Sequence, residues 1–219
     1  MAAPVEEAVN ALRGNLTENT KLPVPRIVKI YIASLKDDFK EERRMLLETV
    51  GPELQTLYDD RTIEIELCDM HFGTGPNGSL VELNPKLLDD HLSEIEICHR
   101  DSKSVFFIAL LGQNLGNLTI PLQIDIETFD AIKKQSNLEE IERLNSWYKL
   151  ITGSKFYTLN TDKYRTRDFN ELTGECVKLQ KLLENKFHEI LSQHINEQIC
   201  DKIKQFQVKA IEHEINKAL

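Results

Sequence analysis

The chain has 219 residues, of which 41% are hydrophobic and 29% charged, and its formal net charge is -9. These proportions are typical of a globular protein and exclude a wholly disordered chain. The basic residues are interleaved with acids, whereas binding to nucleic acid or to an anionic membrane needs clustered Lys and Arg. We therefore expect no nucleic-acid partner and no membrane partner.

The N-terminal segment and the cysteines bear on the cellular compartment. Residues 1–7 lack the basic and apolar regions of a secretory signal, and no apolar run approaches the length of about 20 residues that a membrane span needs. The cysteines are far apart and form neither a CxxC pair nor a disulfide ladder; they are Cys68, Cys98, Cys176 and Cys200. We expect a cytoplasmic protein in a reducing setting.

The first half of the chain alternates strand and helix patterns. Residues 1–25 form an appendix that ends at two prolines, and the apolar run 26–33 predicts a strand buried on both faces. Apolar residues at helical spacing predict a helix over 37–58, whose charged residues we expect on a solvated face. In the segment 62–68, Glu64 and Glu66 alternate with apolar residues, which predicts an edge strand.

Three further patterns complete the predicted sheet. Asn84 and Pro85 are good first residues for a helix over 84–100. The run 104–111 is the most hydrophobic of the chain and predicts a central strand. After helices over 124–134 and 138–151, the short segment 155–159 predicts a strand that joins the same sheet.

The C-terminal part, 168–219, repeats apolar residues at three- and four-residue steps and predicts one long amphipathic helix or two. Such a helix either packs on the domain or acts as a connector or partner surface. The whole order predicts a three-layer α/β sandwich with a short, mainly parallel sheet of flavodoxin-like order 2-1-3-4. We divide the chain into an appendix at 1–25, an α/β domain at 26–160 and a helical extension at 161–219.

Polar residues follow each of the first three predicted strands. The carboxyl ends of parallel strands meet at one edge of a sheet, where α/β folds usually bind ligands, so these residues should converge. They are Ser34, Asp37 and Asp38, then Asp69 and His71, then Gln113 and Asn114. One interpretation is a crevice for a nucleotide-like or carboxylate ligand; the other is a set of helix caps and loop hydrogen bonds.

Other short motifs do not reach a functional assignment. The segment 73–78 matches GxGxxG, but the helix starts only near Pro85, too late for its amides to meet a pyrophosphate. The segment 112–116 lacks the Lys-Ser/Thr end of a P-loop. The six histidines have no metal-ligand spacing, and no GxSxG motif occurs. We expect neither a metal nor a cofactor.

Several of these segments together resemble a known family. They are 26–34 (RIVKIYIAS), Glu41-Glu42-Arg43, 65–73 (IELCDMHFG) and 106–112 (FFIALLG), followed by Trp147-Tyr148 and 156–159 (FYTL). This set is similar to the N-terminal region of the NACHT and WD-repeat proteins, and related domains open the telomerase-associated protein. The resemblance implies a TIR-like, flavodoxin-like domain that stands ahead of a NACHT NTPase module and a WD40 propeller.

The resemblance also implies a role. The N-terminal domain of such proteins is usually an effector or adaptor, so we expect a non-enzymatic, regulatory protein-interaction module. Its partners would be proteins, including further copies of itself, at the edge strand 62–68 and the C-terminal helix. The alternative is an NAD- or nucleotide-processing hydrolase, because some TIR domains cleave NAD with a glutamate after strand 3. Here Thr128 stands at that acidic position, which leaves the adjacent Glu127 as a weak catalytic candidate, and Phe72 replaces the family's Trp. A third possibility is a helical tether with a structural sheet domain.

Overall fold

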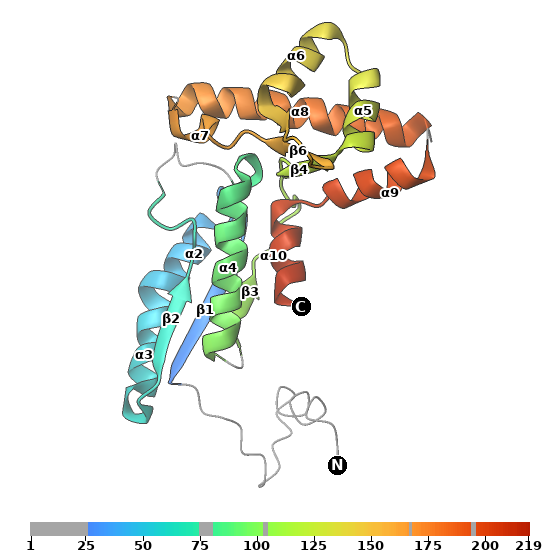
Figure 1. Ribbon diagram of the computed structural model, residues 1–219. Helices are drawn as coiled ribbons and strands as arrows, with labels where there is room; N and C mark the ends of the chain where they lie inside the picture. Colours follow the sequence, from blue (N-terminus) through green and yellow to red (C-terminus); the bar gives the residue numbers. More distant parts are fainter. Residues whose placement is uncertain (1–25, 75–80, 103–104, 167, 194–195) are drawn as a thin grey trace, which may run out of the picture.

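The computed structural model describes residues 26–74, 81–102, 105–166, 168–193 and 196–219 (Figure 1). The predicted appendix at 1–25 and most of the glycine-containing loop, at 75–80, lie outside the described residues. No helix within the described ranges combines the length and the apolar character that a membrane crossing requires.

Within the described residues, three strands form the parallel sheet. They are β1 (Ile27–Ala33), β2 (Glu64–Cys68) and β3 (Phe107–Ala109), in the order β2-β1-β3. The centre of the sheet is β1, whose last four residues are buried, as their apolar side chains require. The predicted order of the first three strands and the helical crossovers between them are confirmed.

The predicted fourth parallel strand is wrong. The segment 155–159 contains β6 (Phe156–Leu159), which pairs antiparallel with β4 (Gln123–Asp125) and β5 (Tyr148–Leu150) in a second sheet of order β4-β6-β5. The cause is tertiary packing: the Tyr157 ring stacks on Phe129, with ring centroids 4.0 Å apart, in the core of the helical part of the chain.

The strand β3 therefore lies at an edge of the described parallel sheet, not at its centre, and it is shorter than the predicted 104–111. Val105 and Leu111, which flank it, are 53% and 50% exposed. Hydrophobic composition alone could not distinguish a strand covered on both sides from one that keeps an open edge.

The first crossover is not one continuous helix. It consists of α2 (Lys40–Met45), a π-helical turn at Leu46–Val50 and α3 (Gly51–Tyr58), which packs against β2. Pro52 has no backbone N–H to donate to the preceding turn, which explains why the regular α-helical pattern is interrupted there. The second crossover ends with α4 (Pro85–Ser102), which packs against β1 on the other side. Asn84 starts α4 as expected, since its side-chain oxygen accepts from Lys86 N at 3.1 Å.

The second packing unit surrounds the antiparallel sheet. It contains α5 (Ile126–Lys134), α6 (Leu138–Trp147), the short α7 (Lys163–Thr166) and the long α8 (Phe169–Gln193). The helix predicted to reach residue 151 ends at Trp147, because the next three residues pair with β6 as β5. The largest hydrophobic cluster of the described chain lies between these elements and includes Phe129, Leu144, Trp147, Leu179 and Phe187.

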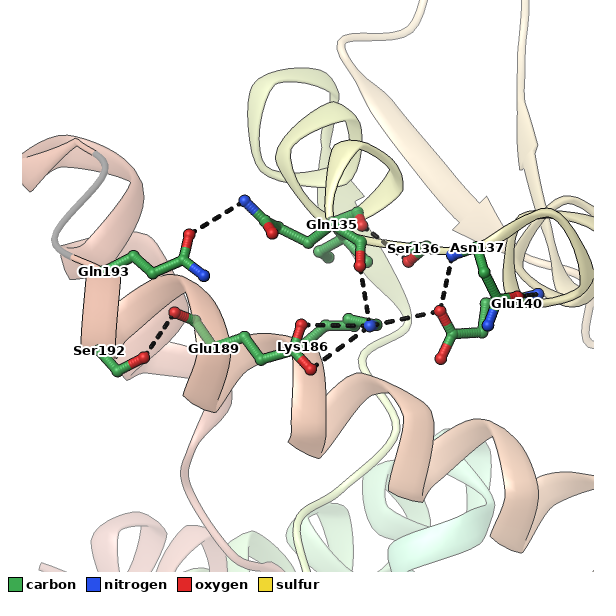
Figure 2. A network of polar contacts seen from close by, with 9 residues as sticks. Gln135, Ser136, Asn137, Glu140, Lys186, Glu189, Ser192 and Gln193 are labelled. Atoms are coloured by element: carbon green, nitrogen blue, oxygen red, sulfur yellow. Dashed lines mark hydrogen bonds and ion pairs between the residues drawn. The ribbon is translucent and has the colours of Figure 1, made fainter.

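A buried lysine joins α8 to the junction of α5 and α6 (Figure 2). Lys186 is 7% exposed, and its Nζ donates to Gln135 O at 2.8 Å and lies 3.3 Å from Glu140 Oε2 and 3.1 Å from Glu189 Oε2. Glu140 also accepts from Asn137 N, within the capping box that begins α6. A single charged side chain thus satisfies three acceptors where two helices meet.

The predicted long C-terminal helix is present as α8, but the described residues after 168 form three helices instead of the predicted one or two. After α8 come α9 (Glu197–Phe206), capped by Asn196, and α10 (Ala210–Ala218). The chain turns after α9, and α10 descends from the helical unit to pack against α4 and β1 (Figure 1). The division at residue 160 stays a proposal.

Candidate functional site

The loops that follow β1 and β2 meet at the carboxyl edge of the parallel sheet. Ser34 follows β1 and is 4% exposed, and its backbone oxygen accepts from His71 Nε2 at 3.0 Å. His71 and Asp69 follow β2, and the backbone N of His71 donates to Asp69 Oδ1 at 2.9 Å. The structure thus brings Ser34, Asp69 and His71 together. Burial lowers the pKa of the His71 imidazole, so neutral His71 is favoured here.

Arg43 fixes the first crossover helix to these loops. Its Nη1 donates to both carboxylate oxygens of Asp69 at 3.1 Å, and its Nη2 donates to Lys36 O at 2.6 Å. The expectation that Arg43 lies on a solvated face is wrong, because it is 6% exposed. The carboxylate of Asp69 compensates the buried guanidinium, which would otherwise be costly to desolvate.

Behind Ser34 lies a buried polar cluster that joins three elements. The Tyr31 hydroxyl, on β1, donates to Glu214 Oε1 on α10 at 3.0 Å, and His91 Nδ1, on α4, lies 2.8 Å from the same oxygen. His91 is 1% exposed and Glu214 is 3% exposed. A carboxylate oxygen only accepts, so His91 Nδ1 donates to Glu214 Oε1; Nδ1 also lies 2.9 Å from the Tyr31 hydroxyl oxygen.

The helix α10 closes the site. Its residues Ala210, Ile211 and Glu214 line a cavity together with Ser34, His71 and Glu82, and we call this the carboxyl-edge cavity. Its volume is about 10 Å³, which is room for roughly one water molecule. Burial raises the pKa of the Glu82 carboxyl at its wall. Among the described residues, Ser34 Oγ, of the cavity lining, and His91 Nε2, which is not part of that lining, both lack a hydrogen-bond partner.

An open groove adjoins the closed cavity on the outer side of Lys36 and His71. We call it the cationic groove: its volume is about 420 Å³, and its charged lining residues are Lys36, Asp37, Lys40, Arg43, Arg44 and Asp69. Among these described lining residues are four cations and two carboxylates; Arg43 is paired with Asp69, and Arg44 with Glu41 outside this set. Asp37 forms an ion pair with Lys40 at 2.8 Å, and that hydrogen bond lowers the pKa of the Asp37 carboxyl. Phe72 also lines the groove and is 59% exposed, so an apolar ring stands beside the charges.

Gln113 and Asn114 do not line the carboxyl-edge cavity or the cationic groove. Both are exposed on the loop after β3, and Asn114 Oδ1 accepts from Gly116 N at 3.0 Å. Gly116 has a φ of +87°, and a Cβ there would lie 2.7 Å from Leu35 Cδ2. A glycine at this turn therefore lets the loop after β3 approach the loop after β1.

Glu127 lies elsewhere. It lines a separate groove of about 850 Å³ beside β4 and α9, with Phe156, Lys202 and Phe206. Its Oε2 is 3.0 Å from Lys202 Nζ, and its side chain is 69% exposed. Neighbouring Thr128 is fully buried. Over the described residues, no three His, Cys, Asp or Glu side chains are grouped so that they could hold a metal ion.

Sequence reasoning missed His91, Glu214 and Arg43. A signal existed for His91, because it falls at helical spacing between the buried Leu88 and Ile95. The same spacing relates Glu214 to Ile211. What no local pattern shows is that the buried face of α10 covers the carboxyl edge of a sheet formed about 180 residues earlier, as the 183-residue separation of Tyr31 and Glu214 measures.

The curated proteins that match this chain include NACHT and WD-repeat proteins of mouse and human. NACHT and WD repeat domain-containing protein 2 is 28% identical in Mus musculus and 27% identical in Homo sapiens over 143 residues, which is 63% of this chain. The chain is similar to NACHT and WD-repeat proteins. NACHT domain- and WD repeat-containing protein 1 of Mus musculus is 29% identical over 94 residues, or 43% of this chain.

The matched region spans only 8% of the length of the first two relatives and 6% of the third. No protein-family model matches the chain, and no solved structure matches it significantly. The similarity therefore concerns a small part of much longer proteins.

Proposed function

We propose that this chain is a non-enzymatic protein-interaction and regulatory module of a NACHT and WD-repeat signalling or scaffold protein, acting in the cytoplasm. Its partners are other proteins, including further copies of itself and, in a longer chain, NACHT and WD40 modules. The similarity to NACHT and WD-repeat proteins over 63% of the chain supports this context.

The observation that carries the proposal is the closure of the carboxyl edge by α10. An α/β fold normally leaves a crevice there for a small molecule. Here the carboxyl-edge cavity holds about 10 Å³ and is lined in part by Ile211 and Glu214 of the same chain. A drug-sized or nucleotide-sized ligand needs at least about 300 Å³. The inner part of the crevice thus serves folding, and the outer surface is left for partners.

We also propose an evolutionary origin for the fold. Three parallel strands in the order β2-β1-β3, with helical crossovers on both sides, support a TIR-like, flavodoxin-like origin related to the opening domain of telomerase-associated protein. The division into 26–160 and 161–219 is part of it, with α10 as the piece of the extension that returns to the sheet.

The alternative function is an NAD- or nucleotide-processing hydrolase. The cationic groove supports it, because a 420 Å³ groove with four cations and an exposed Phe72 suits a phosphate-bearing ligand with a planar base. The position of Glu127 argues against it, since Glu127 lines a different groove and is paired with Lys202.

Two measurements on the purified chain decide between the two functions. The first incubates it with NAD and follows nicotinamide release; the second records melting temperatures with NAD, ATP and ADP. We expect no release above the buffer rate and no shift. Turnover that is lost in either Ser34→Ala or Glu127→Gln, while Glu139→Gln at an exposed position of α6 keeps it, would establish the hydrolase instead.

A further inference from the structure

The edge strand β3 presents unpaired backbone groups. The carbonyl of Phe106 accepts from Tyr31 N at 2.8 Å, and the N–H of Leu110 donates to Ala33 O at 2.9 Å, so even-numbered residues face β1. Alternate residues of a strand direct their backbone groups to opposite sides. The N–H and C=O groups of Phe107 and Ala109 therefore point outward, and no backbone partner for them occurs in the described part of the chain.

The opposite edge, on β2, is less open. The N–H of Glu64 donates to Arg26 O, so the outward groups of β2 belong to Ile65 and Leu67. The side chain of Gln55 already occupies this edge, since its Oε1 accepts from Ile65 N at 2.6 Å. Glu66 is exposed at the centre of β2. A second copy paired there would place Glu66 opposite its own counterpart, and like charges that face each other across strands are destabilising.

Charge distinguishes β3 from the rest of the surface. No Asp, Glu, Lys, Arg or His occurs between Ser104 and Ile124, although the chain as a whole has a net charge of -9. A net charge of -9 opposes the close approach of two copies, and the side chains of β3 add no charge to that repulsion. Val105 and Leu111, which flank β3 on its two sides in the sequence, add exposed apolar side chains. An uncharged, apolar strand edge is what folded proteins normally protect or pair.

We propose that β3 is the self-association edge of this protein, and that its partner is β3 of a second copy in antiparallel, two-fold symmetric pairing. The outward residues fix the register. Pairing Phe107 of one copy with Ala109 of the other uses all four outward groups of each strand and centres the two-fold axis on Ile108. The two parallel sheets then form one continuous sheet of six strands, and Val105 of each copy lies opposite Leu111 of the other.

This inference rests on the proposed function and names the surface and the partner. Its test is sedimentation velocity of the full chain over a concentration series, for wild type and three double variants. V105K/L111K places two pairs of like charges across the interface. V105E/L111E places two pairs of negative charges at the same positions of the interface. M45K/L57K is the control: Met45 and Leu57 are 63% and 71% exposed on the first crossover, and the change in net charge equals that of V105K/L111K.

We expect wild type and M45K/L57K to dimerise as concentration rises, and each β3 variant to stay monomeric. An equimolar mixture of V105K/L111K with V105E/L111E should recover the dimer, because the register sets Lys opposite Glu. Circular dichroism melts check that the variants fold, and concentration-dependent slowing of amide exchange at Phe107 and Ala109 checks the register. The inference is overturned if V105K/L111K dimerises as well as wild type does, or if wild type is monomeric at every concentration. In the first case the proposed function survives, and in the second it then depends on other partners.

Discussion

The Tyr31 hydroxyl donates to Glu214 Oε1 across 3.0 Å, although the two residues are 183 positions apart in the chain. One lies on the central strand and the other on the last helix, and His91 of α4 shares the same carboxylate oxygen. This contact fixes α10 over the carboxyl edge of the sheet. It converts the position at which a ligand would normally enter into part of the folded core.

Replacement of Glu214 should therefore destabilise the whole chain. Glu214→Ala removes the shared acceptor of the Tyr31 hydroxyl and His91 Nδ1. These two groups lie 2.9 Å apart and can then bond only to each other, which leaves one buried donor unsatisfied at a cost of about 1–3 kcal/mol. We expect the free energy of unfolding in urea to fall by about 1–3 kcal/mol. Glu96→Ala is the control, because it removes only the exposed ion pair of Lys217 and Glu96 from the same helix contact. Equal stability of Glu214→Ala and wild type would show that α10 is not held by this carboxylate.

The His71 imidazole should make stability depend on pH. Burial lowers its folded pKa below the ordinary 6.5, so the unfolded chain binds the proton more readily than the folded one. The contribution of neutral His71 is present above pH 6.5 and is lost as pH falls through the range below it. In urea titrations at several pH values, His71→Gln should lose less stability than wild type between about pH 7 and 5. A parallel decline of both proteins would assign the effect to other groups, such as His213, whose pKa burial also lowers.

Thiol labelling should single out one cysteine. Cys98, Cys176 and Cys200 are buried, whereas Cys68 is only half-buried. A hydrogen bond to Cys98 and burial both raise the pKa of the Cys68 thiol, so its reactive thiolate is scarce near neutral pH. We expect one equivalent to react with a maleimide in the native state, at a rate that rises about tenfold per pH unit between about pH 7 and 9.

Cys68→Ser should abolish this native-state reaction, and Cys200→Ser should leave it unchanged. A rate that reaches a plateau within that pH range would mean that the thiol ionises more easily than its surroundings imply.

Lys186 should contribute to the stability of the helical unit (Figure 2). Lys186→Ala removes the donor to Gln135 O and leaves Glu140 and Glu189 without their shared cation. Because water can reach both carboxylates, we expect a loss of about 1–3 kcal/mol, mostly from the unsatisfied carbonyl. Chemical denaturation measures it. Lys178→Ala, in an exposed ion pair on the same helix, is the matched control and should change little.

The parts of the fold that local patterns predict are those that local physics determines. The apolar run at β1 and the capping residue at Asn84 correctly located a central strand and a helix start, because burial and capping act over a few residues. The pairing of β6 could not be predicted that way. Its short, mainly apolar sequence is equally compatible with either sheet, and the choice depends on Phe129 and Tyr148, which reach it through tertiary packing.

The candidate site shows the same division. Ser34, Asp69 and His71 were predictable because residues after parallel strands converge on one edge, whatever the side chains are. The packing of α10 over that edge was not predictable. The periodicity of residues 210–218 indicates that one face of the helix is buried, but not which element it is buried against. Gln113 and Asn114 follow β3, but the turn at Gly116 leaves them exposed.

The mass of the full chain in solution tests the central claim most directly. Light scattering after size-exclusion chromatography, at several loading concentrations, reports whether copies associate. The account predicts a mass that rises above the monomer's 25.3 kDa towards twice that value as concentration increases, with no change on addition of NAD. A mass that stays at 25.3 kDa at every concentration, together with release of nicotinamide from NAD, would contradict it.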